Sequence, residues 1–466
     1  DKNFGPDPIG DSQLFEDENA TDPKTWKWSA ADKLFLKLIR EAHNRKMRII
    51  IDGVFHCTGS TFWAFQDLKK NGERSAFKEW YNVKRWDDSG TPSDEFEYEG
   101  WFGVKELPEL KESANSLAEG PKEHIHAVVK RWMDPNGDGN PEDGIDGWRL
   151  DAAEMVPAGF WREFRSWVRE VNPAAYLTAE LWWEDWPNDK IFNAAPWLQG
   201  DKFDAVMNYR WAREVIRFFV GETTGISPTQ FDERLRDLRA DYPAELNFVL
   251  QNLLDGHDTD RLGSMVVNVD SRYDHNIGVS DNREYNVRKP HADELRTQKL
   301  IALFQMTYLG APMIYYGTEA GMWGADDPDE RKPMLWPYMR YEDETHHPFG
   351  KTRPADKNEF NTDLFNWYKK LIGIRRSHPE LSLGEFTTLV TDDHHDVYGF
   401  KRSLGKKHVV VVLNNSRGEQ EVSIPISLLS VRWKSLLGGE VPIARIGVYA
   451  LRVAAKSGAI LEMNER

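Results

Sequence analysis

The stretch "GIDGWRLDAA" (144–153) decides the fold. It follows the amphipathic segment "EHIHAVVKRWMD" (123–134) and carries Arg149 and Asp151 inside a short apolar run. A short apolar run after an amphipathic helix is typical of a buried strand in an alternating β/α fold. Residues two apart on a strand point to the same face, so these two opposite charges can pair there.

The same alternation of amphipathic helices and apolar strands extends along most of the chain. The predicted helices cover 30–45, 123–134, 159–172 and 293–309, and the predicted strands cover 47–55, 144–153, 175–183, 202–209, 246–258 and 311–319. This pattern predicts a parallel sheet, in a barrel or a doubly wound fold.

Polar residues collect at the carboxyl ends of the predicted strands. They are Asp52, Arg149, Asp151, Glu180, His257, Asp258 and Glu319. A (β/α)8 barrel has its active site at that end of its strands, so the pattern favours a barrel with a catalytic face. The alternative is a set of salt bridges around the rim of the barrel.

Changes in composition and in hydrophobic periodicity along the chain predict three domains. We expect the barrel to comprise residues 1–56 and 124–383, because the helix and strand pattern lies there. Residues 57–123 are rich in Trp, Gly, Asp and Glu and have poor periodicity, which indicates an inserted lobe. Short β-like runs separated by turns predict a C-terminal antiparallel β-sandwich domain over 384–466.

Composition excludes several classes of protein. Hydrophobic residues make up 40% and charged residues 29%, as in ordinary globular proteins, and the net charge of −16 argues against a nucleic-acid partner. No apolar run approaches the roughly 18 residues of a membrane span. The single cysteine, Cys57, excludes an intrachain disulfide. The 19 tryptophans indicate either a large aromatic core or platforms for flat ligands such as sugars.

Three acidic residues, Asp151, Glu180 and Asp258, end nearby predicted strands. Glycoside hydrolysis requires a carboxylate nucleophile and a protonated acid on opposite sides of the bond. An arginine partner keeps a carboxylate ionised, as Arg149 can for Asp151. Apolar surroundings favour a protonated carboxyl, and "LWW" follows Glu180. Local chemistry therefore predicts two carboxyl groups in different environments.

Several motifs carry a family resemblance. "DGWRLDAAE" resembles the G-x-R-x-D motif of the α-amylase superfamily (glycoside hydrolase family 13), and "IDGVF", "TAELWW" and "LLDGHDTDRL" resemble its motifs on the third, fifth and seventh barrel strands. "GAPMIYYGTEAG" resembles the stretch around the eighth strand, and "DDPDERKPMLW" resembles the loop after it. The motifs occur in family order over nearly the whole chain. "WAFQDL" and "LPEL" (107–110) look most similar to the neopullulanase and cyclomaltodextrinase group.

The resemblance implies a retaining glycoside hydrolase that cleaves α-1,4-glucosidic bonds in maltodextrins, cyclodextrins or pullulan through a covalent glycosyl-enzyme. Asp151 would be the nucleophile, Glu180 the general acid and then the base, and Asp258 the residue that stabilises the transition state. The implied substrate-binding residues are Arg149, His257, Asp52, His56, Trp182 and Trp183. No organic cofactor is expected. The alternatives are an α-glucan transglycosylase and a non-catalytic carbohydrate-binding homologue.

The chain departs from the family pattern in two places. The third-strand motif usually continues D-x-V-x-N-H, but His56 and Cys57 replace its Asn and His. A neutral thiol replaces an imidazole hydrogen bond poorly, so His56 is the candidate for the sugar contact, and the family's calcium site between barrel and insert is in doubt. "AAEM" follows the expected nucleophile where the group often has V-A-N-E.

A second region raises the question of calcium. Asp134, Asn136 and Asp138 alternate before a glycine, like the start of a calcium loop, and Asp143 could complete the site. Ile145 occupies the twelfth position, where such a loop has a bidentate glutamate. The alternative is an acidic turn whose side chains bind its own backbone.

The first residues, "DKNFGPDP", lack a Met and a signal peptide and resemble the loop after the second barrel strand. We therefore expect a processed or truncated N-terminus, and a (β/α)8 barrel that lacks its first two strands in this chain. The expected partner is an α-glucan substrate, with no nucleic acid and no membrane. The oligomeric state stays open. A periplasmic or secreted location is favoured because α-glucan polymers are met outside the cytoplasm.

Overall fold

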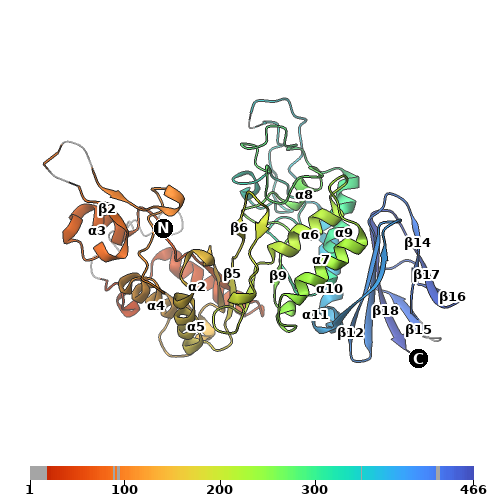
Figure 1. Cartoon of the computed structure of the whole chain (residues 1–466), viewed down its shortest axis with the longest axis horizontal. Helices are drawn as coiled ribbons and strands as arrows, with labels where there is room; N and C mark the ends of the chain where they lie inside the picture. The colour runs from red at the N-terminus through yellow and green to blue at the C-terminus, as the bar shows by residue number, and fades with distance from the viewer. Residues whose placement is uncertain (1–17, 88–89, 92–94, 348, 427–430, 466) are drawn as a thin grey trace. The chain divides into compact units, whose positions relative to one another are not determined.

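The computed structural model describes residues 18–87, 90–91, 95–347, 349–426 and 431–465 (Figure 1). The "DKNFGPDP" prediction falls outside these residues. The chain forms two compact units, Asp1–Met207 and Asn208–Arg466, and each is described by itself. No helix within the described residues is long and apolar enough to cross a bilayer.

The first unit contains a parallel sheet of four strands in chain order. They are β1 (Ile50–Gly53), β4 (Gly147–Leu150), β5 (Tyr176–Ala179) and β8 (Ala205–Val206). All four fall inside predicted runs but are shorter, and Asp151 and Glu180 directly follow the paired segments of β4 and β5. Gly147 is required by this pairing, since a Cβ there would lie 2.0 Å from the Tyr176 carbonyl oxygen.

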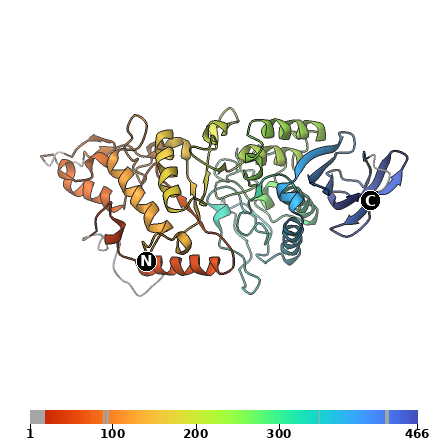
Figure 2. The same cartoon turned by 90° about the horizontal axis from the view of Figure 1, so that it is seen from below.

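α2 (Ala30–His43) precedes β1, α4 (Glu119–Met133) lies between β1 and β4 in the chain, and α5 (Ala158–Val171) lies between β4 and β5. α2 begins at a capping box in which Ser29 and Asp32 each accept the other's backbone N–H. α4 and α5 lie side by side (Figures 1 and 2). The buried ring of Phe164 on α5 packs on Phe55 and on Trp148 of β4, which fixes the helix against the sheet.

The segment between β1 and α4 forms the expected non-periodic region. It holds α3 (Trp63–Asn71) and a short antiparallel pair, β2 (Val83–Arg85) and β3 (Glu97–Tyr98). Its core is aromatic, because the fully buried Phe65 packs on Tyr81 and Tyr98. A second small hairpin, β6 (Trp183–Asp185) with β7 (Lys190–Ile191), follows β5.

The second unit begins with a parallel pair, β9 (Gln251–Asn252) and β10 (Ala311–Pro312). Its helices are α6 (Tyr209–Phe219), α7 (Pro228–Ala240), α8 (Leu262–Met265), α9 (Ala292–Thr307), α10 (Thr362–Ser377) and α11 (Pro379–Leu383). From Leu300 to Thr307 every residue of α9 is buried, so this helix has no solvent face in its C-terminal half.

Two antiparallel sheets end the second unit. One has the order β11 (Glu385–Asp392), β12 (Val397–Leu404), β13 (Lys407–Asn414), β18 (Ser457–Glu465) and β15 (Val431–Ser435). The other has the order β14 (Gln420–Ile424), β17 (Val448–Val453) and β16 (Ile443–Arg445). Both sheets contribute to one apolar core, as in a β-sandwich.

The division into units differs from the predicted domain boundaries. It falls between Met207 and Asn208, inside the predicted barrel, and groups the C-terminal sheets with residues 208–383. Contacts explain this grouping: the fully buried Arg402 donates to the carbonyl oxygens of Thr307 (2.9 Å) and Gly384 (2.9 Å). The boundaries at 56/57, 123/124 and 383/384 remain predictions.

Candidate active site

The register of the first sheet brings the predicted site residues together. Asp52 on β1 is the ladder partner of Arg149 on β4, and Leu150 on β4 is the partner of Ala179 on β5. Asp151 and Glu180 directly follow this last pair, so they emerge side by side at the carboxyl ends of neighbouring strands. The Glu180 backbone N–H donates to the Leu150 carbonyl oxygen at 2.9 Å, which continues the ladder to this level.

One guanidinium group joins three carboxylates at this edge. Nη1 of Arg149 lies 3.0 Å from both oxygens of Asp52 and also contacts Oδ1 of Asp151. Nη2 lies 2.9 Å from Oε1 of Glu180. The Arg149 side chain is 13% exposed and that of Glu180 is 9% exposed, so this pair is largely shielded from water, whereas the Asp52 side chain is 47% exposed. The expected pair of Arg149 and Asp151 is present, and the additional contact with Glu180 was not predicted.

The surroundings of Glu180 are more polar than its sequence neighbours indicate. Besides the contact with Arg149, its Oε2 accepts the backbone N–H of Ala152 at 3.0 Å. Ala152 has φ 40° and ψ 49°, a left-handed conformation that is uncommon for a residue with a Cβ. This turn aims the Ala152 N–H at Glu180, so a backbone donor and an arginine join the apolar neighbours that the sequence indicates.

The two tryptophans predicted to bind substrate lie just beyond Glu180. The rings of Trp182 and Trp183 are stacked, with centroids 6.0 Å apart and planes at 23°. Both side chains are half-buried. The segment that follows Glu180 therefore offers two stacked aromatic rings.

His56 also lies at this site, whereas Cys57 is inert. Nδ1 of the buried His56 is 3.9 Å from Oδ2 of Asp151, and its ring lies 5.2 Å from that of Trp101. Burial lowers the pKa of His56, and the carboxylate of Asp151 partly opposes that shift. Burial raises the pKa of the Cys57 thiol to about 11, so at neutral pH it is protonated and a poor nucleophile.

Glu154 is a further carboxyl group that the sequence reading did not select. It lies in the short 3-10 helix η6 (Ala153–Met155) that follows Asp151. Burial raises its pKa to about 7, and the negative charges of Glu180 and Asp151 add to the shift. Its buried Oε2 has no hydrogen-bond partner within the described residues. The only sequence signal was the departure "AAEM".

We expect Glu154→Gln to stabilise the protein at alkaline pH. A glutamate whose folded pKa lies near 7, above its usual 4.5, contributes stability that is complete below pH 4.5 and lost as pH rises through 7. The variant avoids that loss, so its unfolding free energy should exceed that of the wild type by about 1–3 kcal/mol near pH 8. Calorimetric melting at several pH values measures this gap. A difference that stays constant between pH 5 and pH 8 would contradict the assignment.

The second unit carries the remaining predicted pair, His257 and Asp258. Nε2 of His257 lies 3.2 Å from Oδ2 of Asp258, and Oδ1 of Asp258 accepts from Nη2 of Arg331 at 3.1 Å. Arg331 ends η9 (Asp329–Arg331) and also contacts Asp327 at 3.0 Å. The motif "DDPDERKPMLW" contains Arg331, but its sequence alone did not predict a role for this arginine. The guanidinium contact orients the Asp258 carboxylate.

Buried polar groups hold the segment that bears Asp258. Asp255 accepts the backbone N–H of Leu262 at 2.9 Å and the Thr318 hydroxyl at 2.6 Å, and Asp260 accepts the Tyr285 hydroxyl at 2.6 Å. Burial raises the pKa of both aspartates. The segment is thus anchored on each side of Asp258, which limits the positions that its carboxylate can take.

The proposed calcium loop satisfies its own polar groups. The Asp134 carboxylate accepts the N–H groups of Gly137 (3.1 Å) and Gly139 (2.9 Å), and the Asp138 carboxylate accepts the N–H of Asn140 at 2.8 Å. Within the described residues, no three Asp, Glu, His or Cys side chains are grouped as metal ligands. The side chains of Asp134, Asn136 and Asp138 thus accept backbone N–H groups of their own turn.

Calcium binding at this loop stays a prediction that calorimetry can test. If it occurs, calcium raises the melting temperature above that in EGTA, and Asp138→Asn, which keeps the turn hydrogen bond but removes a charge, abolishes most of the rise. Equal melting temperatures with and without calcium contradict the site.

Comparison with known proteins supplies an independent finding. The family described as "Alpha amylase, catalytic domain" matches residues 29–384. The chain is similar to neopullulanase 2 of Thermoactinomyces vulgaris, with 33% identity over 97% of this chain and 68% of that protein. It is also similar to a cyclomaltodextrinase of Geobacillus thermopakistaniensis, with 32% identity over 88% of this chain and 58% of that protein.

Solved structures agree with the sequence comparison. The ligand-free cyclic α-maltosyl-(1→6)-maltose hydrolase of Arthrobacter globiformis matches with a TM-score of 0.68 and 26% identity, over 92% of this chain and 78% of that one. The chain thus covers 68% of the length of the neopullulanase and 58% of the length of the cyclomaltodextrinase.

Proposed function

We propose, because the chain belongs to the α-amylase family, that it is a retaining hydrolase of α-1,4-glucosidic bonds. Its fold is that of the family, a (β/α)8 catalytic domain with a C-terminal antiparallel β domain, and the parallel sheet of the first unit is consistent with it. The observation that carries the proposal is the contact of Asp151 and Glu180 with the two arms of one arginine. That arrangement places the two carboxyl groups beside each other. Their other neighbours differ, since His56 lies 3.9 Å from Asp151 whereas Glu180 accepts the backbone N–H of Ala152.

In the proposed first step, an Asp151 oxygen attacks the anomeric carbon while the bond to the leaving oxygen breaks. Glu180, protonated, gives its proton to that oxygen. In the second step Glu180 takes a proton from water, the water oxygen attacks the anomeric carbon, and the Asp151 ester bond breaks. Configuration is retained because the carbon is inverted twice.

The strand spacing supports retention. Retaining enzymes hold the two carboxyl groups roughly 5–5.5 Å apart, whereas inverting enzymes separate them by roughly 6.5–9.5 Å. Asp151 and Glu180 follow ladder partners on adjacent strands, which lie about 4.8 Å apart in a sheet. The short separation leaves no room for a water molecule between the Asp151 carboxylate and the anomeric carbon, which an inverting enzyme would need.

The remaining residues take supporting roles in the proposal. Arg149 orients the Asp151 carboxylate, and Asp52 positions that arginine. His56 offers a ring nitrogen beside Asp151 for a sugar hydroxyl. Asp258 binds hydroxyl groups of the distorted sugar together with His257, and Arg331 orients its carboxylate.

The substrates that we propose are maltodextrins, cyclodextrins and pullulan, on the basis of the names of the relatives. Transglycosylation shares the glycosyl-enzyme and differs only in whether water or a sugar hydroxyl attacks it. We expect hydrolysis to dominate when water is the only acceptor, and added maltose to yield longer oligosaccharides if transfer competes.

Incubation with maltoheptaose, β-cyclodextrin and pullulan tests the proposal. We expect shorter maltooligosaccharides from at least one substrate, with the α-anomer appearing first in a proton NMR time course. Initial β-anomer would contradict retention. No product from any of the three would contradict hydrolysis and favour a carbohydrate-binding role.

A further inference from the structure

The loop after β10 in the second unit presents two aromatic rings to solvent. Trp336 is 45% exposed and Tyr338 is 79% exposed. Their rings are stacked, with centroids 6.1 Å apart and planes at 24°. An exposed and nearly parallel pair of rings offers flat apolar surface to a binding partner.

A rigid turn holds the two rings. Pro337 fixes the backbone between them, and the Met339 N–H donates to the Trp336 carbonyl oxygen at 3.1 Å, which closes the 336–339 turn. The Trp336 N–H donates to the Tyr341 hydroxyl at 2.6 Å, and that hydroxyl donates to the Met334 carbonyl oxygen at 3.0 Å. Ordering the rings in advance lowers the entropic cost of binding.

A small cavity adjoins the turn. Its volume is about 200 Å³, and it is lined by Met322, Trp323, Lys332, Pro333, Leu335, Tyr341 and Asn358. Tyr341 belongs to both features, since it lines the cavity and anchors Trp336. The lining combines an indole ring with an ammonium and an amide, the kind of surface that takes a polar ligand with apolar faces.

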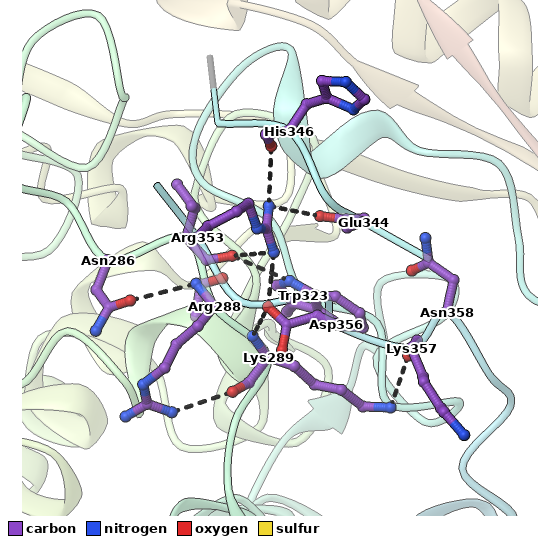
Figure 3. Close-up of polar contacts among 12 residues, drawn as sticks. Asn286, Arg288, Lys289, Trp323, Glu344, His346, Arg353, Asp356, Lys357 and Asn358 are labelled. Carbon is purple, nitrogen blue, oxygen red and sulfur yellow. Dashed lines mark hydrogen bonds and ion pairs between the residues drawn. The ribbon is translucent and has the colours of Figure 1, made fainter. Parts of the chain in front are cut away.

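An ionic network fixes the base of this loop (Figure 3). The guanidinium of Arg353 lies 3.1 Å from Glu344 and 2.7 Å from Asp356. Lys332 lies 2.8 Å from Glu344. The Arg353 side chain is only 5% exposed. The lysines 289 and 332 both approach the ring of Trp323, at 5.4 and 5.5 Å from its centroid. Two lysines therefore contact Trp323, which lines the cavity.

We propose that the 336–339 turn and the adjoining cavity bind an α-glucan chain, as an accessory site for the substrate of the proposed function. Pyranose rings have apolar faces that can stack on Trp336 and Tyr338, and polar edges that suit the exposed Arg340, Glu342 and Asp343 nearby. A neutral chain is not repelled by a protein with net charge −16.

The position of the loop supports this ligand. The same loop contains Arg331, which contacts Asp258 at 3.1 Å, so it leads from a predicted catalytic carboxylate to the aromatic turn. A chain that is bound near Asp258 can therefore continue along residues of a single loop. The inference rests on the proposed function for the identity of the ligand, but its geometry lies wholly within the second unit.

The test uses the full chain and the double variant Trp336→Ala/Tyr338→Ala. We expect KM for amylose to rise by about two- to tenfold with kcat on maltotriose unchanged. Affinity electrophoresis in amylopectin gels, which requires no catalysis, should show weaker retardation of the double variant. Phe349→Ala is the matched control, since Phe349 is exposed on the same loop but lies outside the turn and the cavity.

Each outcome decides the proposal. Wild-type behaviour of the double variant in both assays overturns it, as does an equal loss on maltotriose and amylose, which indicates damage to the catalytic site. A change of oligomeric state in gel filtration with unchanged retardation also overturns it, because the rings would then bind a second copy. If the wild type hydrolyses nothing yet is retarded through Trp336 and Tyr338, the proposed function fails and the binding site stands.

Discussion

Glu180→Gln should lower kcat on maltoheptaose by about 10²- to 10⁴-fold, because the leaving oxygen would receive no proton. The amide keeps the size of the side chain and can still meet Arg149 through its oxygen, so the fold should be unaffected. Steady-state hydrolysis with reducing-end detection measures the loss. Glu170→Gln, an exposed glutamate on α5, is the matched control and should behave as the wild type.

A substrate with a leaving group that needs no proton separates the roles of the two carboxyl groups. With α-maltosyl fluoride, Glu180→Gln should still release fluoride in the first step, whereas Asp151→Asn should release almost none, because the nucleophile is missing. Equal loss in both variants would show that Glu180 is not the general acid. Unimpaired fluoride release by Asp151→Asn would remove Asp151 from the nucleophile's role.

Local sequence predicted the parts of the site that depend on one strand. The spacing of Arg149 and Asp151 was enough to predict their pairing, and both side chains do meet. The alternation of apolar runs and helices located β1, β4 and β5, although the paired segments are shorter than the runs. Such features depend on the alternation of side chains along one strand, which can be read directly from the sequence.

The parts that depend on several strands were not predictable in this way. The contact between Arg149 and Glu180 arises from the ladder between β4 and β5, and the N–H of Ala152 reaches Glu180 only because that residue is left-handed. Glu154 gained its raised pKa from burial in the same turn.

The tryptophans illustrate both readings of the aromatic content. Trp148, Trp161, Trp211 and Trp323 are among the largest fully buried side chains, so many of them build the core. Trp336 is instead exposed on a turn beside Tyr338. The number of tryptophans could not distinguish these two uses, because they differ in how far each side chain is buried, which only the structure shows.

Arg149→Met should destabilise the first unit by about 3–5 kcal/mol, because it leaves Asp52, Asp151 and Glu180 facing one another without their shared cation. The carboxylates of Asp151 and Glu180 are only 22% and 9% exposed, so water can replace little of the lost interaction. Calorimetric melting measures the loss. Arg162→Met is the control: its pair with Asp201 is 50% and 37% exposed, and its removal should cost less than about 1 kcal/mol.

Arg149→Lys distinguishes charge from geometry at the same position. A lysine ammonium keeps the positive charge but lacks the two-armed fork that contacts Asp151 and Glu180 at once. We therefore expect it to recover part of the stability and little of the activity, because the two carboxyl groups would no longer be held side by side. If Arg149→Met melts like Arg162→Met, the three carboxylates do not depend on this arginine, and the arrangement on which the proposed chemistry rests is wrong.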